Sequence, residues 1–108
     1  MKEVRLESAR VCRIWRTEID TRQAGKYDDF ARTKSLRMFR EQPGFVGVLF
    51  ASREGHRVVI TFWHDLRSIE ALRDSVTYRA TVDEIEQSGF LRGDQTVEVF
   101  SLDAVFDG

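Results

Sequence analysis

Residues 45–63 read FVGVLFASREGHRVVITFW. Two runs rich in β-branched and aromatic residues flank the short connection Arg53–His56, a pattern typical of an antiparallel hairpin with a tight turn. The expected strands are Phe45–Ser52 and Arg57–Trp63, and Gly55 is the residue expected to supply a positive φ in the turn. Both runs carry apolar side chains at consecutive positions, so both faces of the predicted hairpin are apolar.

The sequence on either side of this hairpin predicts two helices and two further strands. Asp20 or Thr21 can cap the first helix, Pro43 and Gly44 follow its end, and Asp65 can cap the second helical region. In chain order the expected elements are a strand over Val11–Ile19, a helix over Ala24–Arg40, the hairpin, a helical region over Arg67–Ser88 with a break near Ser75–Thr77, and a strand over Gln95–Phe106. This β-α-β-β-α-β order predicts an α+β, ferredoxin-like fold, an antiparallel sheet with two helices on one face.

The second face of the sheet needs a cover. In the first hairpin strand we expect two apolar sets on opposite faces, namely Phe45, Leu49 and Ala51 against Val46, Val48 and Phe50. Helices on one face leave the other exposed, and a monomer rarely shows so large an apolar patch. We therefore expect a homodimer formed by two-fold pairing of the open faces. The alternative is a monomer in which residues 1–10 cover the sheet.

Length and composition restrict the remaining possibilities. A chain of 108 residues suits one domain, expected over residues 11–108 after a loose, charged lead-in over residues 1–10. A net charge of −1 argues against nucleic acid as a partner, and no run approaches the roughly 20 apolar residues of a membrane span. The N-terminus lacks the apolar core of a signal peptide. The single cysteine, Cys12, permits no internal disulfide, which fits a cytoplasmic location, and we expect it to be a small buried side chain.

Several short motifs follow one another in a recognisable order. They are Arg13-Ile14-Trp15-Arg16, Gln42-Pro43-Gly44-Phe45, Thr61-Phe62-Trp63 followed by the segment Asp65–Ala71, Phe90-Leu91, and the closing VEVFSLDAV. Over about residues 11–106 this pattern resembles the antibiotic biosynthesis monooxygenase (ABM) domains. The resemblance implies a dimeric α+β barrel, in which two sheets pack face to face and each monomer holds a ligand cavity between its sheet and its helices.

The resemblance also implies a set of site residues. The catalytic candidates are Arg13, His64 and Tyr78, and the substrate-binding candidates are Trp15, Arg16, Trp63 and Phe90. The two tryptophans suit a flat aromatic ligand, an arginine can hold a phenolate oxygen, and His64 is the expected general base. Arg13 and Arg16 fall on opposite faces of their strand, so at most one reaches the cavity. The alternatives are core packing for the aromatic residues, a salt bridge for the arginines, and an exposed or capping position for His64.

Three functions are compatible with this pattern. The first is cofactor-independent oxidation of a small aromatic or phenolic compound by O2, with no metal site. The second is a non-catalytic dimer that binds a small ligand or serves a structural role. The third is haem binding or degradation, for which related enzymes use a histidine late in the second helix and an asparagine in the first strand. Here residues 78–88 contain no histidine, and Val82 and Trp15 stand at about the two positions.

Overall fold

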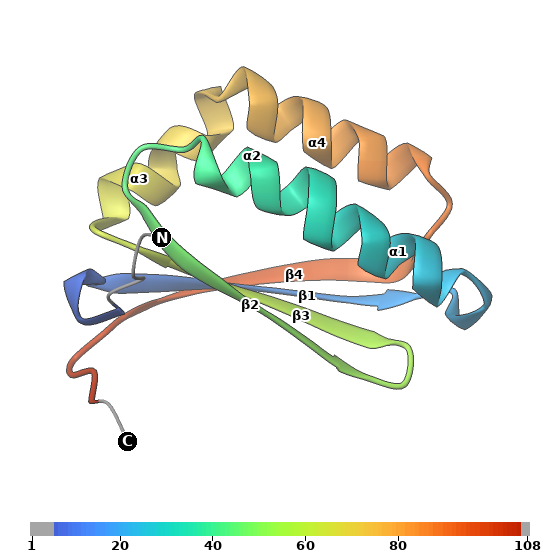
Figure 1. The fold of residues 1–108 in the computed structure, drawn as a ribbon, viewed down its shortest axis with the longest axis horizontal. Coiled ribbons are helices and arrows are strands. Elements are labelled where there is room, and N and C mark those ends of the chain that lie inside the picture. Colours follow the sequence, from blue (N-terminus) through green and yellow to red (C-terminus); the bar gives the residue numbers. More distant parts are fainter. Residues whose placement is uncertain (1–5, 107–108) are drawn as a thin grey trace.

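The computed structural model describes residues 6–106 and confirms the predicted α+β, ferredoxin-like architecture. Four antiparallel strands form one sheet in the order β2-β3-β1-β4, and the long helices all cover the same face (Figure 1). The strands are β1 (Val11–Ile19), β2 (Phe45–Arg53), β3 (His56–Trp63) and β4 (Leu91–Ser101). Within the described residues, no helix is long and apolar enough to cross a membrane.

The first helical region runs without interruption from residue 24 to residue 40. It consists of α1 (Ala24–Phe30), a wider π-helical segment η3 (Ala31–Ser35) and α2 (Leu36–Arg40), preceded by a 3-10 turn, η2 (Thr21–Gln23). The carboxylate of Asp20 caps this start, because it accepts a hydrogen bond from the backbone N–H of Arg22 at 3.1 Å. Hydrogen bonds from Arg22 hold the pKa of Asp20 well below its usual range.

The second helical region breaks where the sequence predicted. It contains α3 (Leu66–Glu70), a 3-10 turn η4 (Ala71–Asp74) and α4 (Val76–Gln87). Ser75 is extended, with φ −80° and ψ 121°, and its hydroxyl accepts a hydrogen bond from the N–H of Tyr78 at 3.2 Å. Asp65 caps α3 in the same way, through the N–H of Ser68 at 2.8 Å. The break sets a new direction for α4, which begins with the turn that carries Tyr78.

One residue of β2 faces the side of the sheet opposite to the side that the sequence predicted. A bulge lies between Phe45 and Gly47 in β2, so Phe45 pairs with Trp63 and lies on the helix side of the sheet with Val48 and Phe50. Simple alternation, which grouped Phe45 with Leu49 and Ala51, is therefore wrong at this residue.

The predictions for the β2–β3 turn and for the last strand also differ from the structure. In the β2–β3 turn the positive φ, 52°, belongs to Glu54 and not to Gly55. β4 begins at Leu91 and ends at Ser101, instead of running from Gln95 to Phe106. Gly93, expected in a turn, lies within β4 with φ 70°, where the register with β1 shifts between Arg16 and Glu18. A glycine at a bulge keeps the strand paired through a conformation that other residues resist.

The core between the sheet and the helices is divided into two clusters of buried side chains. The first is centred on Trp63 and includes Val11, Met38, Phe39, Val59, Ile69 and Leu72. The second contains Ile19, Tyr27, Phe30, Ala31 and Ile85. Trp15, in the middle of β1, is partly buried and packs against both clusters. The space around Trp15 is therefore the junction of the two halves of the core.

Among residues 6–106, no helix covers the opposite face of the sheet (Figure 1). Its apolar side chains come from all four strands, and Leu49 and Phe100 remain 52% and 50% exposed. The predicted lead-in falls partly on residues 1–5, which lie outside the described residues. Its described part forms a 3-10 turn, η1 (Leu6–Ser8), followed by Ala9, which is 2% exposed. The backbone N–H of Arg10 then donates to the carbonyl of Trp63 at 2.9 Å, so this segment is attached at one end of the sheet.

Candidate functional site

A cavity of about 240 Å³ lies between the sheet and the helices. This volume is slightly below the roughly 300–1,000 Å³ of sites for drug-sized ligands, so it suits a small molecule. All four strands contribute to its floor, through Arg13, Trp15, Phe50, Val59, Gln95 and Val97. The helical side of the wall includes Tyr27, Ala31, Ser35, Met38, Tyr78 and Val82.

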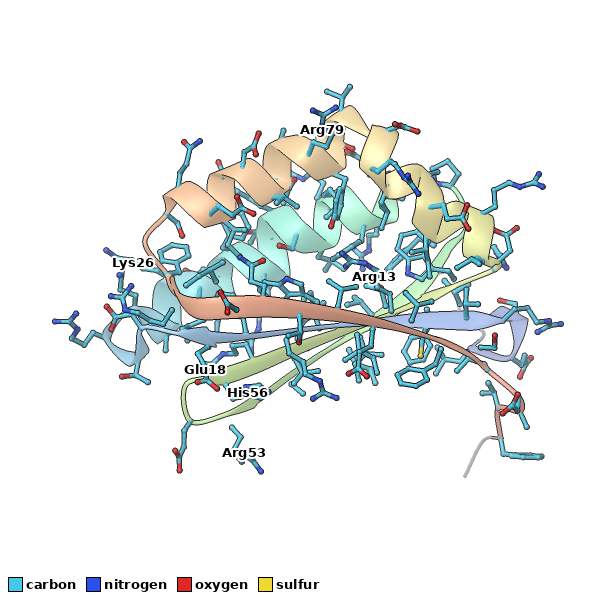
Figure 2. All side chains as sticks on the ribbon, turned by 180° about the vertical axis from the view of Figure 1, so that it is seen from behind. Arg13, Glu18, Lys26, Arg53, His56 and Arg79 are labelled. Atoms are coloured by element: carbon cyan, nitrogen blue, oxygen red, sulfur yellow. The ribbon has the colours of Figure 1, made fainter. Side chains whose placement is uncertain are left out.

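Strand alternation decides which arginine reaches this cavity. Arg13 and Trp15 point toward the helices, whereas Arg16 lies on the open face, where its Nε is 3.6 Å from a carboxylate oxygen of Glu98. Figure 2 shows Arg13 in the layer between the sheet and the helices and Glu18 on the far side of the sheet. Arg16, predicted as a substrate-binding residue, therefore lies outside the cavity and forms the alternative salt bridge.

Arg13 forms a close pair with Tyr78 across the cavity. A terminal nitrogen of its guanidinium donates to the phenol oxygen of Tyr78 at 2.8 Å, and the guanidinium carbon lies 5.6 Å from the centre of the tyrosine ring. Within residues 6–106 this is the only hydrogen bond of the Arg13 side chain, so the other N–H groups of the guanidinium are available to a ligand. A partly buried arginine with free donors is suited to an anionic oxygen.

Trp15 supplies a flat surface next to this pair. Its indole N–H donates to the side-chain oxygen of Gln95 on β4 at 3.0 Å, which fixes the orientation of the ring. Opposite the sheet, the π-helical segment η3 contributes two small residues, Ala31 and Ser35, to the wall. A π-helical turn is wider than an α-helical turn and often occurs at functional sites. Small side chains at this point leave room above the tryptophan.

Three further predicted site residues lie outside the cavity wall. Trp63 is on the helix side, but it is 0% exposed, packs edge-on against Phe39 and Phe45, and donates its indole N–H to Thr61 at 2.8 Å. It has no surface left for a ligand. Trp63 pairs with Val11 at the end of the sheet, whereas the cavity surrounds the middle, where Trp15 pairs with Val59.

His64 and Phe90 do not line the cavity, for different reasons. His64 follows the last residue of β3 and is exposed, with its Nδ1 3.2 Å from the backbone carbonyl of Ser8. Phe90 packs edge-to-face against Phe30, with ring centres 6.3 Å apart, and lines a separate surface hollow. The structure therefore brings together Arg13, Trp15 and Tyr78 from the predicted set and leaves the other four residues apart.

Tyr27 and Gln95 are among the cavity residues that were not predicted as site residues. Tyr27 belongs to the apolar stripe of the first helix. A hydroxyl group within an otherwise apolar stripe was the feature of the sequence that could have marked it as a site residue. Gln95 stands at the predicted start of the last strand and had no local pattern to mark it. Val82, which was expected from the sequence at about the position of the histidine in the haem enzymes, lines the cavity. Cys12 is 7% exposed, and burial raises the pKa of its thiol.

Comparison with solved structures identifies the same fold in several monooxygenases. The ActVA-Orf6 monooxygenase of Streptomyces coelicolor, solved with the ligand nanaomycin D, superimposes with a TM-score of 0.75 at 16% identity, over 94% of each chain. SnoaB, a cofactor-independent oxygenase from Streptomyces nogalater, gives a TM-score of 0.71 at 17% identity, over 93% of this chain and 99% of its own.

A protein of unknown function from Nitrosomonas europaea is also similar, with a TM-score of 0.75 at 14% identity, over 94% of this chain and 97% of its own. No protein-family model matches the sequence, and no curated protein matches it. At these identities the likeness shows the fold alone. The chain thus has the fold of the antibiotic biosynthesis monooxygenases, as its sequence motifs implied.

Proposed function

We propose that this protein is a monooxygenase that oxidises a small phenolic or anthrone-like compound with O2 and without a bound cofactor. The observation that carries the proposal is the Arg13–Tyr78 pair, held at 2.8 Å beside the flat ring of Trp15 in an otherwise largely apolar cavity. Two solved structures of the same fold, one named a monooxygenase and one a cofactor-independent oxygenase, support this choice of chemistry.

Each of the three residues has a part in this proposal. Trp15 stacks on the aromatic ring of the substrate. The free N–H groups of Arg13 bind the phenolate or enolate oxygen that forms when the substrate loses a proton. Tyr78, on the other side of the guanidinium, keeps Arg13 pointed into the cavity and can donate to the same oxygen. Stabilising this anion is the main requirement, since the electron-rich anion itself reduces O2.

The reaction balances without a further reductant. An anthrone-type CH2 group loses two hydrogens and gains one oxygen atom as a carbonyl, and the second oxygen atom leaves with those hydrogens as water. The first proton has to leave the cavity. His64 is exposed and lies outside the cavity wall, and Glu86 is the only carboxylate among the described residues of the wall. Glu86 is exposed on α4, where it can pass a proton to solvent.

Oxygen consumption with anthrone tests the proposal. Chelator-treated protein should consume O2 and form anthraquinone faster than the protein-free solution. Arg13→Gln should lower kcat/KM about tenfold to hundredfold, the expected cost of losing a charge-assisted hydrogen bond. Arg79→Gln is the matched control, because Arg79 is exposed on the outer side of α4 (Figure 2). Binding of anthrone without O2 consumption would refute this function and favour the non-catalytic ligand-binding protein.

We further propose that the functional unit is a homodimer, paired through the open sheet face. The apolar side chains on that face include Ile14, Leu49, Ala51, Val58, Ile60, Phe62 and Phe100, and the face also carries the exposed Arg16–Glu98 ion pair. Burying apolar surface is worth about 25 cal/mol per Å², and pairing two identical faces by a two-fold axis removes both from water.

The dimer can be tested by sedimentation with two charge substitutions. Ile60→Asp, in the centre of the open face, should convert the protein to monomers at micromolar concentration. Val76→Asp is the control, because Val76 is 81% exposed on the helical layer and its substitution should leave the dimer intact. A wild-type protein that sediments as a monomer would refute the pairing.

A further inference from the structure

Tyr27 is buried and yet its hydroxyl has no hydrogen-bond partner within the described part of the chain. The residue is 3% exposed and belongs to the wall of the main cavity. It also borders a smaller hollow of about 80 Å³ on the side of Phe50 and Arg57. Among the described residues, no fully buried side-chain oxygen or nitrogen lacks a partner. The Tyr27 hydroxyl therefore keeps some accessible surface, and the residue borders both spaces.

The ring of Tyr27 is held firmly in this position. The guanidinium carbon of Arg57 lies 5.7 Å from its ring centre, in a cation–π contact. Arg57 is itself 6% exposed and is fixed by Asp28, at 3.2 Å from its Nε, and by the carbonyl of Glu54 at 2.6 Å. Burial raises the pKa of Tyr27 to about 12, so the phenol stays protonated at neutral pH. A fixed, protonated phenol without a partner is a hydrogen-bond donor for a ligand.

The position of Tyr27 relative to the rest of the site defines the ligand that it would bind. Tyr27 belongs to the second core cluster, Tyr78 packs against the first, and Trp15 lies between them. Along β1, Arg13 lies on one side of Trp15, and Thr17, which pairs with Arg57, lies on the other. Because Arg57 contacts the ring of Tyr27, the cavity has a cationic group toward one end, Trp15 in the middle and the neutral Tyr27 toward the other end. The two ends complement oxygens of different charge on one aromatic ligand.

We propose that Tyr27 is a specificity-determining residue that donates a hydrogen bond to a second, uncharged oxygen of the substrate, opposite the oxygen bound by Arg13. The ligand is thus an aromatic ring system with oxygen functions at both ends, one ionisable and one a neutral acceptor such as a carbonyl or an ether. This inference rests on the proposed function for the location of the first oxygen. It adds the chemistry of the opposite end.

The test compares two probes in three proteins by titration calorimetry at neutral pH without O2. The probes are 1-naphthol, with one oxygen, and 4-methoxy-1-naphthol, with an added acceptor oxygen at the opposite end. Tyr27→Phe removes only the hydroxyl and should weaken binding of the methoxy probe about fivefold to tenfold, with little effect on 1-naphthol, since one hydrogen bond is lost. Tyr78→Phe is the matched variant, and it should weaken both probes equally, because the naphthol hydroxyl is common to them.

Each outcome has a separate meaning. If the wild-type protein binds both probes and Tyr27→Phe changes neither affinity, or changes both equally, the role of Tyr27 is refuted and the proposed function stands. If the wild-type protein binds neither probe, the aromatic cavity itself is refuted, and this inference fails with it. Thermal unfolding of both variants checks that each retains its fold.

Discussion

Replacing each tryptophan in turn by phenylalanine should distinguish a core residue, Trp63, from a residue of the ligand site, Trp15. Trp63 is 0% exposed, makes edge-on contacts with Phe39 and Phe45, and donates a hydrogen bond to Thr61 at 2.8 Å. Trp15 is only partly buried, and its indole N–H binds Gln95, an exposed side chain. The two substitutions are chemically identical, so any difference between them comes from their surroundings.

The expected loss of stability follows from these contacts. In Trp63→Phe the missing hydrogen bond costs about 1 kcal/mol and the space left by the smaller ring costs about 1–2 kcal/mol. A total of about 2–3 kcal/mol corresponds to a fall in Tm of roughly 10–20 °C for a domain of this size. Trp15→Phe should cost less than about 1 kcal/mol, because its lost hydrogen bond is solvent-exposed and its ring is incompletely packed.

Ligand affinity should show the opposite order. Trp15→Phe should weaken binding of 1-naphthol about fivefold, because the stacking surface shrinks, whereas Trp63→Phe should leave binding unchanged at a temperature where it is folded. Urea unfolding followed by circular dichroism measures the stabilities, and calorimetry measures the affinities. Each variant also retains a single tryptophan, so naphthol should quench the fluorescence of Trp63→Phe alone. Equal losses of stability, or a larger loss of affinity in Trp63→Phe, would refute this division of roles.

Three further predictions test individual parts of the structure. Gly44→Ala should destabilise the protein by at least about 2 kcal/mol in urea unfolding, because Gly44 has φ +82° and an added Cβ would overlap the side chain of Ser68. An unchanged free energy of unfolding would contradict this turn geometry. Ser75→Ala should cost about 0.5–2 kcal/mol through loss of the α4 cap, and Ser75→Asp should restore most of it. Burial raises the pKa of Tyr27 from 10.0 to about 12, so the phenol of the unfolded chain loses its proton at a lower pH than the phenol of the folded protein. The free energy of unfolding should therefore fall between pH 10 and pH 12, by about 3 kcal/mol in total. Tyr27→Phe should remove this alkaline loss, and a profile identical to the wild type would contradict the burial of the phenol.

The sequence by itself determined the features that act over short distances. The apolar runs on either side of the β2–β3 turn predicted a hairpin with two apolar faces. The caps at Asp20 and Asp65 and the break near Ser75 were also predicted correctly. A cap bonds a backbone group within three residues, and strand alternation repeats every second residue, so both are readable from the local sequence. The same alternation separated Arg13 from Arg16 before the structure showed which one faces the cavity.

Only the tertiary structure decided where the cavity lies and which side chains meet in it. Arg13 and Tyr78 are 65 residues apart in the chain, and Trp15 and Gln95 are 80 apart, so no local pattern could pair them. The two tryptophans share a sheet face but lie on different strands and at different levels along the sheet, which the register between β1 and β3 fixes. Cavities form where packing between distant segments is incomplete. For that reason the sequence predicted the layers of this protein, while the packing of its helices on the sheet selected the site.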